Sequence, residues 1–260
     1  MPRFSANLSM LFTEVELIDR FEAAREHGFN AVEIQFPYDL GVETIRRKLA
    51  EHDLQLVLFN VPADDLLTGG EGLACVPEKK DQFREALALA VSYAKILKPD
   101  AVNVLPGRCF DATRHDDYRV TFKQNLCLAA DAFSRLGIKT VFEAINSGDM
   151  SGFIIDTGAK MLSIQDELQR PDIFLQLDIY HLLMMDENVA AFVKEHAQRI
   201  GHIQFADCPG RGQPGTGSAD FTAIFSAIDL SGYSGWMGAE YQPVGATSAS
   251  LGWLHNSDAL

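Results

Sequence analysis

The sequence predicts an α/β fold, a single (β/α)8 TIM barrel that takes up residues 1–260. Short runs typical of β-strands recur eight times, and a stretch with helical character follows each run. A chain of 260 residues also fits one barrel of this kind. Since parallel strands need a crossover between them, eight strand–helix units favour a closed parallel barrel over an open doubly wound sheet.

The predicted strands start 24 to 46 residues apart, which leaves room for a helix and two turns after each strand. They are Arg3–Asn7, Ala31–Phe36, Gln55–Asn60, Ala101–Leu105, Thr140–Glu143, Ile173–Asp178, His202–Phe205 and Trp236–Glu240.

Three of the predicted helices carry clear boundary signals. Thr13 and Glu16 have the spacing of a capping box, which predicts a helix start there and an end near Gly28. Residues 78–98 and 116–136 show apolar positions three or four residues apart, which is the pattern of long amphipathic helices.

Composition excludes several classes of partner. The chain has 22 Lys+Arg against 36 Asp+Glu, a formal charge of −14, which argues against binding to a nucleic-acid backbone. No apolar run approaches the ~18 residues of a membrane span, and the first residues lack the apolar run of a signal peptide. We therefore expect a cytoplasmic protein without a membrane or nucleic-acid partner.

Cysteine spacing and the absence of glycine motifs argue against disulfides, structural zinc and nucleotide cofactors. Cys75, Cys109, Cys127 and Cys208 show no pairing typical of disulfides or structural zinc, so we expect reduced thiols. The chain has neither a dinucleotide fingerprint after the first strand nor a phosphate-binding P-loop motif, and we expect no nucleotide cofactor.

Polar residues end four consecutive predicted strands, at the barrel end where active sites lie. Side-chain alternation points Glu143, Asp178, Gln204 and Glu240 inward. Three inward carboxylates repel one another unless a cation or protons neutralise them. A divalent metal is the simplest solution, and an all-oxygen set favours Mg²⁺ or Mn²⁺ over Zn²⁺. The alternative is that some of these residues cap helices or pair with arginine.

Two histidines and a glutamine accompany this set. His181 follows Asp178 by three residues and could bind a substrate oxygen or a metal, or serve the structure alone. His202 precedes Gln204 by two residues and should point into the barrel one layer lower. We expect His202 and Gln176 to hold the carboxylates in place from that layer.

Seven segments together resemble the hydroxypyruvate isomerases, a branch of the xylose isomerase-like TIM barrels. The resemblance runs from residue 3 to about residue 253, and the similar 2-oxo-tetronate isomerases share much of the pattern. The segments are RFSANLSMLF, VEIQFPYD (32–39), LFNVPADD (58–65), FEAINSGD (142–149), LQLDIYH (175–181), GHIQFADCPGRGQPGTG (201–217) and GWMGAEYQP (235–243).

The resemblance implies roles for individual residues. Glu143 and Glu240 match the pair of glutamates that donate and accept the proton, and with Asp178 and Gln204 they match the metal-binding set. His181 and Arg211 match substrate-binding positions of related ketose epimerases. Gln204 departs from many sugar isomerases and epimerases of the superfamily, which have His there, and an amide oxygen should bind softer metals less well.

The implied reaction interconverts hydroxypyruvate and 2-hydroxy-3-oxopropanoate (tartronate semialdehyde) through an enediol. A base removes a C–H proton, an acid returns it to the next carbon, and a divalent ion stabilises the enediol charge. The substrate carboxylate needs a cation, for which Arg211 and Arg108 are candidates. The Gly/Pro-rich loop 209–217 is either a lid over the site or merely a flexible loop.

Other readings remain open at this point. A 2-oxo-tetronate isomerase or a ketose epimerase would need a larger pocket, whereas bulky residues near Phe36 and Tyr38 favour the three-carbon acid. A non-catalytic sugar-acid binding protein would not need two converging glutamates. An abasic-site endonuclease is excluded, because it needs several histidines at strand ends and only His181 is well placed, and because the formal charge is −14. A homo-oligomer is possible.

Overall fold

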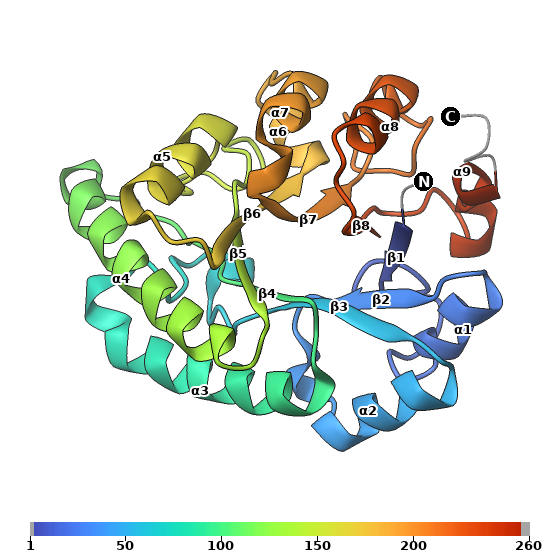
Figure 1. Cartoon of the computed structure of the whole chain (residues 1–260), viewed down its shortest axis with the longest axis horizontal. Coiled ribbons are helices and arrows are strands. Elements are labelled where there is room, and N and C mark those ends of the chain that lie inside the picture. Colours follow the sequence, from blue (N-terminus) through green and yellow to red (C-terminus); the bar gives the residue numbers. More distant parts are fainter. Residues whose placement is uncertain (1–2, 256–260) are drawn as a thin grey trace.

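The computed structural model describes residues 3–255 and contains the predicted closed barrel. Eight parallel strands pair in chain order from β1 to β8, and β8 closes the ring on β1, with the helices arranged around it (Figure 1). The strands are β1 Arg3–Asn7, β2 Ala31–Ile34, β3 Gln55–Asn60, β4 Ala101–Asn103, β5 Lys139–Glu143, β6 Ile173–Asp178, β7 Ile200–Phe205 and β8 Trp236–Ala239. All eight predicted strands are therefore confirmed, with ends displaced by at most two residues.

The helices alternate with the strands, as the crossover argument requires. The α-helices are α1 Arg20–Glu26, α2 Val42–Glu51, α3 Lys80–Leu97, α4 His115–Ser134, α5 Gly158–Leu168, α6 Ile179–Met184, α7 Val189–His196, α8 Phe221–Leu230 and α9 Gly252–His255. Short 3-10 helices lie at Pro37–Asp39, Leu66–Thr68, Pro77–Lys79, Ala112–Arg114, Ala197–Arg199 and Thr247–Ser250.

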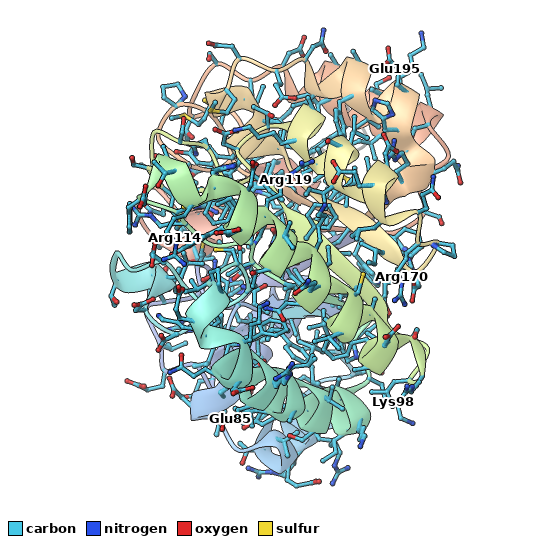
Figure 2. The ribbon with its side chains drawn as sticks, turned by 90° about the vertical axis from the view of Figure 1, so that its left-hand side faces the viewer. Glu85, Lys98, Arg114, Arg119, Arg170 and Glu195 are labelled. Atoms are coloured by element: carbon cyan, nitrogen blue, oxygen red, sulfur yellow. The ribbon has the colours of Figure 1, made fainter. Side chains whose placement is uncertain are left out.

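The two long predicted helices are confirmed as α3 and α4. Lys98 follows α3 with a left-handed φ of 49°, and Pro99 cannot continue the helix. The outward surface of this side of the barrel carries charged side chains such as Arg119 and Arg170 (Figure 2). Lys123 of α4 donates to Glu167 of α5 at 2.8 Å, so some of these charges link neighbouring helices.

The capping box predicted at Thr13 and Glu16 is wrong. Helix α1 begins only at Arg20, and the residues before it form turns. The Glu14 carboxylate instead accepts hydrogen bonds from the backbone N–H and the hydroxyl of Thr247, far along the chain. Glu14 thus takes part in a contact with a distant segment, and the local spacing of Thr13 and Glu16 does not start a helix.

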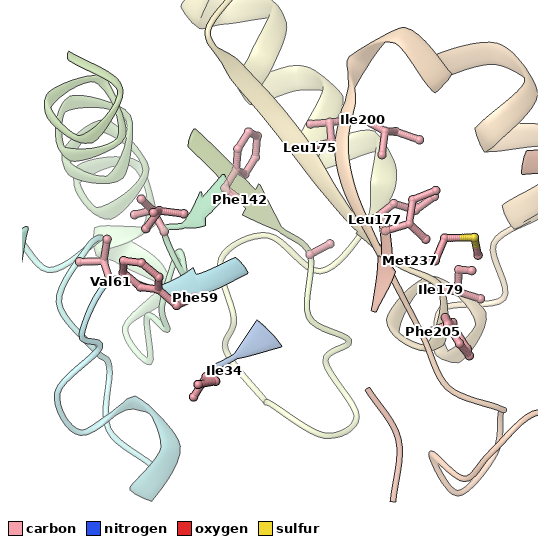
Figure 3. Packing of buried hydrophobic residues seen from close by; sticks show 14 of the residues in the cluster. Ile34, Phe59, Val61, Phe142, Leu175, Leu177, Ile179, Ile200, Phe205 and Met237 are labelled. Atoms are coloured by element: carbon pink, nitrogen blue, oxygen red, sulfur yellow. The ribbon is translucent and has the colours of Figure 1, made fainter. Parts of the chain in front are cut away.

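The main apolar core lies between the strands and the helices. Phe142 of β5, Leu177 of β6 and Phe205 of β7 are fully buried there and face outward from the barrel (Figure 3). Because side chains alternate along a strand, their neighbours Glu143, Asp178 and Gln204 point into the barrel. Packing of the apolar residues therefore fixes the direction of the polar ones.

All four cysteines are free in the structure, as predicted. Within residues 3–255, no helix is both long and apolar enough to cross a membrane.

Candidate active site

The four strand-end residues predicted from the sequence meet inside the barrel. Backbone pairing aligns Glu143 with Gln176 and Asp178 with Gln204, while Gln204 is level with Gly238, two residues before Glu240. All four side chains are at most 5% exposed. Three carboxylates are thus buried together, which only strong compensating contacts permit.

A cavity of about 100 Å³ lies beside these carboxylates. Its lining combines apolar and polar side chains, which suits a small, polar ligand. Its lining includes five of the predicted site residues, Glu143, Gln176, His181, Arg211 and Glu240. The other lining residues are Gln35, Phe36, Asn60, Leu66, Leu67, Leu105, Ile145, Asp149 and Met150.

Glu143 reaches the cavity from the end of β5. Its Oε1 accepts a hydrogen bond from Asn103 Nδ2 at 2.7 Å. Burial raises the pKa of Glu143 well above its usual range, and the nearby carboxylates of Glu240 and Asp178 raise this pKa further. A carboxyl group with a raised pKa keeps its proton to higher pH than an exposed one and can release this proton to a neighbour.

Glu240 follows β8 and is held at both oxygens. Its Oε1 accepts hydrogen bonds from Asn7 Nδ2 at 2.9 Å, Gln35 Nε2 at 2.9 Å and Gln204 Nε2 at 3.1 Å. Its Oε2 accepts one from Arg211 Nη2 at 2.7 Å. Burial raises the pKa of Glu240 to about 7, although the Arg211 guanidinium acts in the opposite direction. This carboxyl group therefore changes charge near neutral pH.

Asp178 ends β6 and begins α6 at the same time. Its Oδ1 accepts the backbone N–H groups of Tyr180 at 2.8 Å and His181 at 3.3 Å, which caps the helix. Its Oδ2 is buried and has no hydrogen-bond partner among the described residues. A buried carboxylate oxygen without a partner is costly, so it marks a place where a ligand is needed.

The side chain of Asn146 determines which nitrogen of His181 carries the proton. Asn146 Oδ1 accepts the Asp149 backbone N–H at 2.8 Å, and its Nδ2 donates to Asp149 Oδ2 at 3.0 Å, so the amide has one orientation. The same Nδ2 lies 2.7 Å from His181 Nδ1, which must act as the acceptor. Burial lowers the pKa of His181 to about 3, so the ring is neutral with its proton on Nε2.

Arg211 lies in the Gly/Pro-rich loop after β7. Its guanidinium packs 5.1 Å from the centre of the Tyr180 ring, and its Nε has no partner among residues 3–255. The loop is folded around the buried Asp207 carboxylate, which accepts the backbone N–H groups of Cys208, Gly215 and Ala219. These hydrogen bonds give the loop a defined conformation that brings Arg211 to the carboxylates.

Arg108 is not brought to this site. Its Nε donates to the Ser151 carbonyl at 2.7 Å, and its guanidinium lies 4.6 Å from the centre of the Phe110 ring. Arg108 does not line the cavity beside Glu143. Backbone pairing of Arg108 with Phe153 directs this arginine to another part of the loops after β4 and β5.

The predicted partners of Gln204 and His202 differ from those observed. Gln204 Oε1 accepts from Gln176 Nε2 at 2.6 Å, so the oxygen expected to bind a metal is already engaged. His202 lies level with Gln176, one layer below Gln204 as expected. However, its Nε2 lies 2.7 Å from Glu33 Oε2, and His202 therefore pairs with a carboxylate that the sequence reading omitted.

The sequence reading also missed Gln35, Asn103 and Asp149, which line the cavity or bond its carboxylates. Alternation along the predicted strand 31–36 places Glu33 and Gln35 on the same face, so this pattern could have revealed both. Asp149 lies in a loop without periodicity, and nothing in the local sequence marks it.

A divalent metal fits the residues present. One donor atom from each of Glu143, Asp178 and His181 lies within 4.8 Å of the other two. Since His181 Nδ1 accepts from Asn146 and its Nε2 carries the proton, the carboxylates of Glu143 and Asp178 are the ligands that this group offers in the observed tautomer. Asp178 Oδ2 and Gln176 Oε1 are buried acceptors without partners among the described residues. A hard cation would coordinate these oxygens and reduce the repulsion between the carboxylates.

Comparison with known proteins agrees with this fold. The model of the xylose isomerase-like TIM barrel family matches residues 21–257. The hydroxypyruvate isomerase of Escherichia coli is 38% identical over 98% of both chains. A 2-oxo-tetronate isomerase of Pectobacterium atrosepticum is 37% identical over 97% of both. A crystal structure of a protein named AP endonuclease, family 2, from Brucella melitensis has a TM-score of 0.94 and 34% identity, covering 98% of both chains. The chain therefore belongs to the xylose isomerase-like TIM barrel family and is an isomerase.

Proposed function

We propose that this isomerase interconverts hydroxypyruvate and 2-hydroxy-3-oxopropanoate by moving a proton between adjacent carbons through an enediol. The observation that carries the proposal is the pair of buried glutamates, Glu143 and Glu240, which line one small cavity and have raised pKa values. One carboxyl group can be protonated while the other is ionised, because repulsion between two like charges in one site makes the two groups lose their protons at different pH values.

Each glutamate then has one task in each direction of the reaction. The ionised carboxylate removes a C–H proton from the carbon that carries the hydroxyl, and the protonated carboxyl group delivers a proton to the former carbonyl carbon. The hydroxyl proton passes to the former carbonyl oxygen in the enediol, so that the hydroxyl becomes the new carbonyl. Positioned acid–base groups of this kind typically contribute about 10²–10⁴-fold to the rate. In the reverse direction the two groups exchange tasks.

Arg211 and His181 supply the contacts that orient the substrate. The partner-free Nε of Arg211 can donate to the substrate carboxylate while Nη2 stays on Glu240. The Nε2–H of neutral His181 can donate to the oxygen that becomes negatively charged in the enediol. A neutral imidazole serves this purpose because it does not repel Arg211.

We also propose that Glu143 and Asp178, with Glu240 nearby, hold a Mg²⁺ or Mn²⁺ ion. Gln204 would join them only after turning its amide, because its oxygen now accepts from Gln176. When bound, the ion would supply Lewis-acid stabilisation of the two enediol oxygens.

The size of the cavity supports a small acid. Phe36 lines it, together with Leu66, Leu105, Ile145 and Met150. Tyr38, expected to stand beside Phe36, instead donates its hydroxyl to the Asn60 carbonyl at 2.6 Å and is not part of this wall. A three-carbon substrate fits about 100 Å³ more readily than a four-carbon one.

A 2-oxo-tetronate is the second candidate substrate, because an isomerase named for it is 37% identical over nearly the whole chain. The similar Brucella melitensis protein is named an endonuclease, but this activity finds less support in the present site. The potential metal-binding cluster found among residues 3–255 contains one histidine and two carboxylates, whereas the multinuclear zinc centre expected of such a nuclease needs several histidines.

The test is turnover of metal-stripped protein on hydroxypyruvate and on a 2-oxo-tetronate, with and without added Mg²⁺ or Mn²⁺. Higher kcat/KM on hydroxypyruvate is expected, together with a rise in rate when metal is returned. Higher kcat/KM on the four-carbon acid would keep the mechanism and change the substrate. Absence of turnover on both acids under all conditions would contradict the proposal.

A further inference from the structure

A fourth inward carboxylate, Glu33 of β2, lies beneath the proposed catalytic pair. Glu33 is 1% exposed and does not line the cavity. Its Oε2 lies 2.7 Å from His202 Nε2 and 3.5 Å from Ser5 Oγ. The acid–base chemistry described above does not use this group, although its burial is costly.

Glu33 and Glu240 share two hydrogen-bond donors. Asn7 Nδ2 lies 2.9 Å from Glu33 Oε1 and 2.9 Å from Glu240 Oε1. Gln204 Nε2 lies 2.7 Å and 3.1 Å from the same two oxygens. Since each amide nitrogen carries two hydrogens, each can donate one to Glu33 and the other to Glu240. Glu33 therefore fixes the direction in which both amides point.

This arrangement leaves Glu240 Oε2, which accepts a hydrogen bond from Arg211 alone among the described residues, as the less occupied of the two oxygens. Gln35 also donates to Glu240 Oε1, which thus accepts three N–H groups. A proton cannot easily bind an oxygen that already accepts three donors, so Oε2, next to Arg211, is the oxygen that exchanges the proton. Without Glu33, Asn7 and Gln204 could turn, and Glu240 would lose its orientation.

We infer that Glu33 is a positioning residue for Glu240 and acts through the shared amide donors of Asn7 and Gln204. This inference rests on the proposed function, in which Glu240 exchanges a proton with the substrate. Carboxylates that orient a neighbouring functional group commonly change activity by about 10–100-fold when they are replaced.

Strand β8, which is separated from β2 by β1 in the barrel, leaves room for the Glu33 carboxylate. A methyl group at Gly238 of β8 would lie 2.3 Å from Glu33 Oε2 and 2.5 Å from its Oε1. Gly238 does not have a positive φ, so close approach is the reason for glycine at this position. A side chain there would push the carboxylate away from its donors.

The main test is Glu33→Met, which fills a similar volume but accepts no strong hydrogen bond. We expect kcat to fall about 10–100-fold with little change in KM, because the substrate contacts of Arg211 and His181 remain. Glu33→Gln, which keeps an oxygen for Asn7 and Gln204, should recover most of the loss. Gly238→Ala should lower kcat as Glu33→Met does. Glu187→Met is the matched control, because Glu187 is a half-buried glutamate that does not line the cavity.

A role limited to filling space would leave kcat of Glu33→Met close to that of the unmodified protein, and this result would overturn the inference. So would an equal loss of kcat in Glu33→Gln and Glu33→Met. Crystal structures of Glu33→Met and Gly238→Ala give a second readout that needs no substrate. Displacement of the Glu240 carboxylate from Asn7 and Gln204 is expected, and an unmoved carboxylate in both would contradict the inference. Failure of the unmodified protein to turn over either acid would refute the proposed function, while the crystal structures would still decide the role of Glu33.

Discussion

The guanidinium of Arg211 lies across the carboxylate of Glu240, with Nη2 2.7 Å from Oε2. The same nitrogen is 3.5 Å from Asp178 Oδ2. A single cation from a loop therefore compensates two of the three strand-end carboxylates. Another donor of this guanidinium, Nε, is buried without a hydrogen-bond partner among residues 3–255, so the same side chain can also hold an anionic substrate.

Arg211→Lys should weaken substrate binding more than catalysis. Lysine keeps the positive charge near Glu240 but loses the planar set of donors that can hold a carboxylate and Glu240 together. A lost hydrogen bond to a charged group costs about 1.5–3 kcal/mol, so KM should rise about 10–100-fold with a smaller change in kcat. Steady-state kinetics on hydroxypyruvate checks this. Arg108→Lys is the control, and an equal KM for both variants would exclude Arg211 from substrate binding.

Glu143→Gln should abolish most activity and yet stabilise the metal-free fold above neutral pH. The folded state holds the Glu143 proton more tightly than the unfolded chain, since burial raises the pKa of this group. Between the ordinary pKa and the raised one the folded state binds more protons, so the stability contributed by Glu143 falls as pH rises. Glutamine does not titrate, and the variant escapes this loss.

Thermal melts in EDTA at pH 5 and pH 8 measure the effect of Glu143→Gln. The difference in Tm between the variant and the unmodified protein should increase from pH 5 to pH 8, by about 2–4 °C for each kcal/mol. Glu167→Gln is the contrasting control, because Lys123 and other neighbours lower the pKa of Glu167 and its replacement should not stabilise the protein. A difference that shrinks toward pH 8 would show that Glu143 is not destabilising when ionised.

The barrel and the direction of its strand-end side chains could be predicted because both follow from periodic patterns. Phe142, Leu177 and Ile203 alternate with Glu143, Asp178 and Gln204, and apolar burial on the outside forces the polar set inward. The role of Arg211 could be predicted for a different reason, since this residue stands in a short Gly/Pro-rich loop directly after a strand. These features are local in the chain, so they can be recognised in a single sequence.

The hydrogen-bond partners could not be predicted, because they depend on contacts between distant segments. Glu14 bonds Thr247 across 233 positions, which removed the expected helix start. His202 bonds Glu33 across 169 positions rather than acting with its neighbour Gln176. Likewise, Arg108 stands after a strand as Arg211 does. Only the three-dimensional structure, in which Arg108 pairs with Phe153, shows that Arg108 lies away from the cavity that Arg211 lines.

Asp178→Asn should weaken divalent metal binding without unfolding α6. The asparagine oxygen can still accept the N–H groups of Tyr180 and His181, while an NH2 group replaces Oδ2, which makes no hydrogen bond within residues 3–255. We expect Mn²⁺ affinity, measured by calorimetry, to fall about tenfold or more. The control is Asp220→Asn, which changes another capping aspartate at the start of α8. Equal Mn²⁺ affinity in both variants would remove Asp178 from the metal site.

Phe36→Ala should shift substrate preference toward the four-carbon acid. Phe36 belongs to the cavity wall, and its truncation adds room without removing a polar contact. Space for one carbon is commonly worth about 1–3 kcal/mol, so the ratio of kcat/KM for a 2-oxo-tetronate to that for hydroxypyruvate should rise about tenfold. Tyr38→Phe, which changes a residue outside this wall, should leave the ratio unchanged. A ratio that falls in Phe36→Ala would show that Phe36 does not limit substrate length.

Asp207→Asn should loosen the loop that carries Arg211 while leaving the barrel intact. The Asp207 carboxylate accepts three backbone N–H groups, including that of Gly215 at 2.7 Å through Oδ2. An asparagine NH2 group cannot accept the Gly215 N–H and would repel it, so the loop around Arg211 loses one of the three backbone N–H groups that bond to the Asp207 side chain. We expect KM to rise, as in Arg211→Lys. We also expect faster proteolytic cleavage between residues 209 and 217 and a circular dichroism spectrum like that of the unmodified protein.

The control for this prediction is Asp111→Asn, which changes an aspartate of another loop that bonds Thr113 and should alter neither KM nor the rate of cleavage. Unchanged KM together with faster cleavage would mean that Asp207 does not hold Arg211 in its binding position, which would then depend on the ion pairs with Glu240 and Asp178.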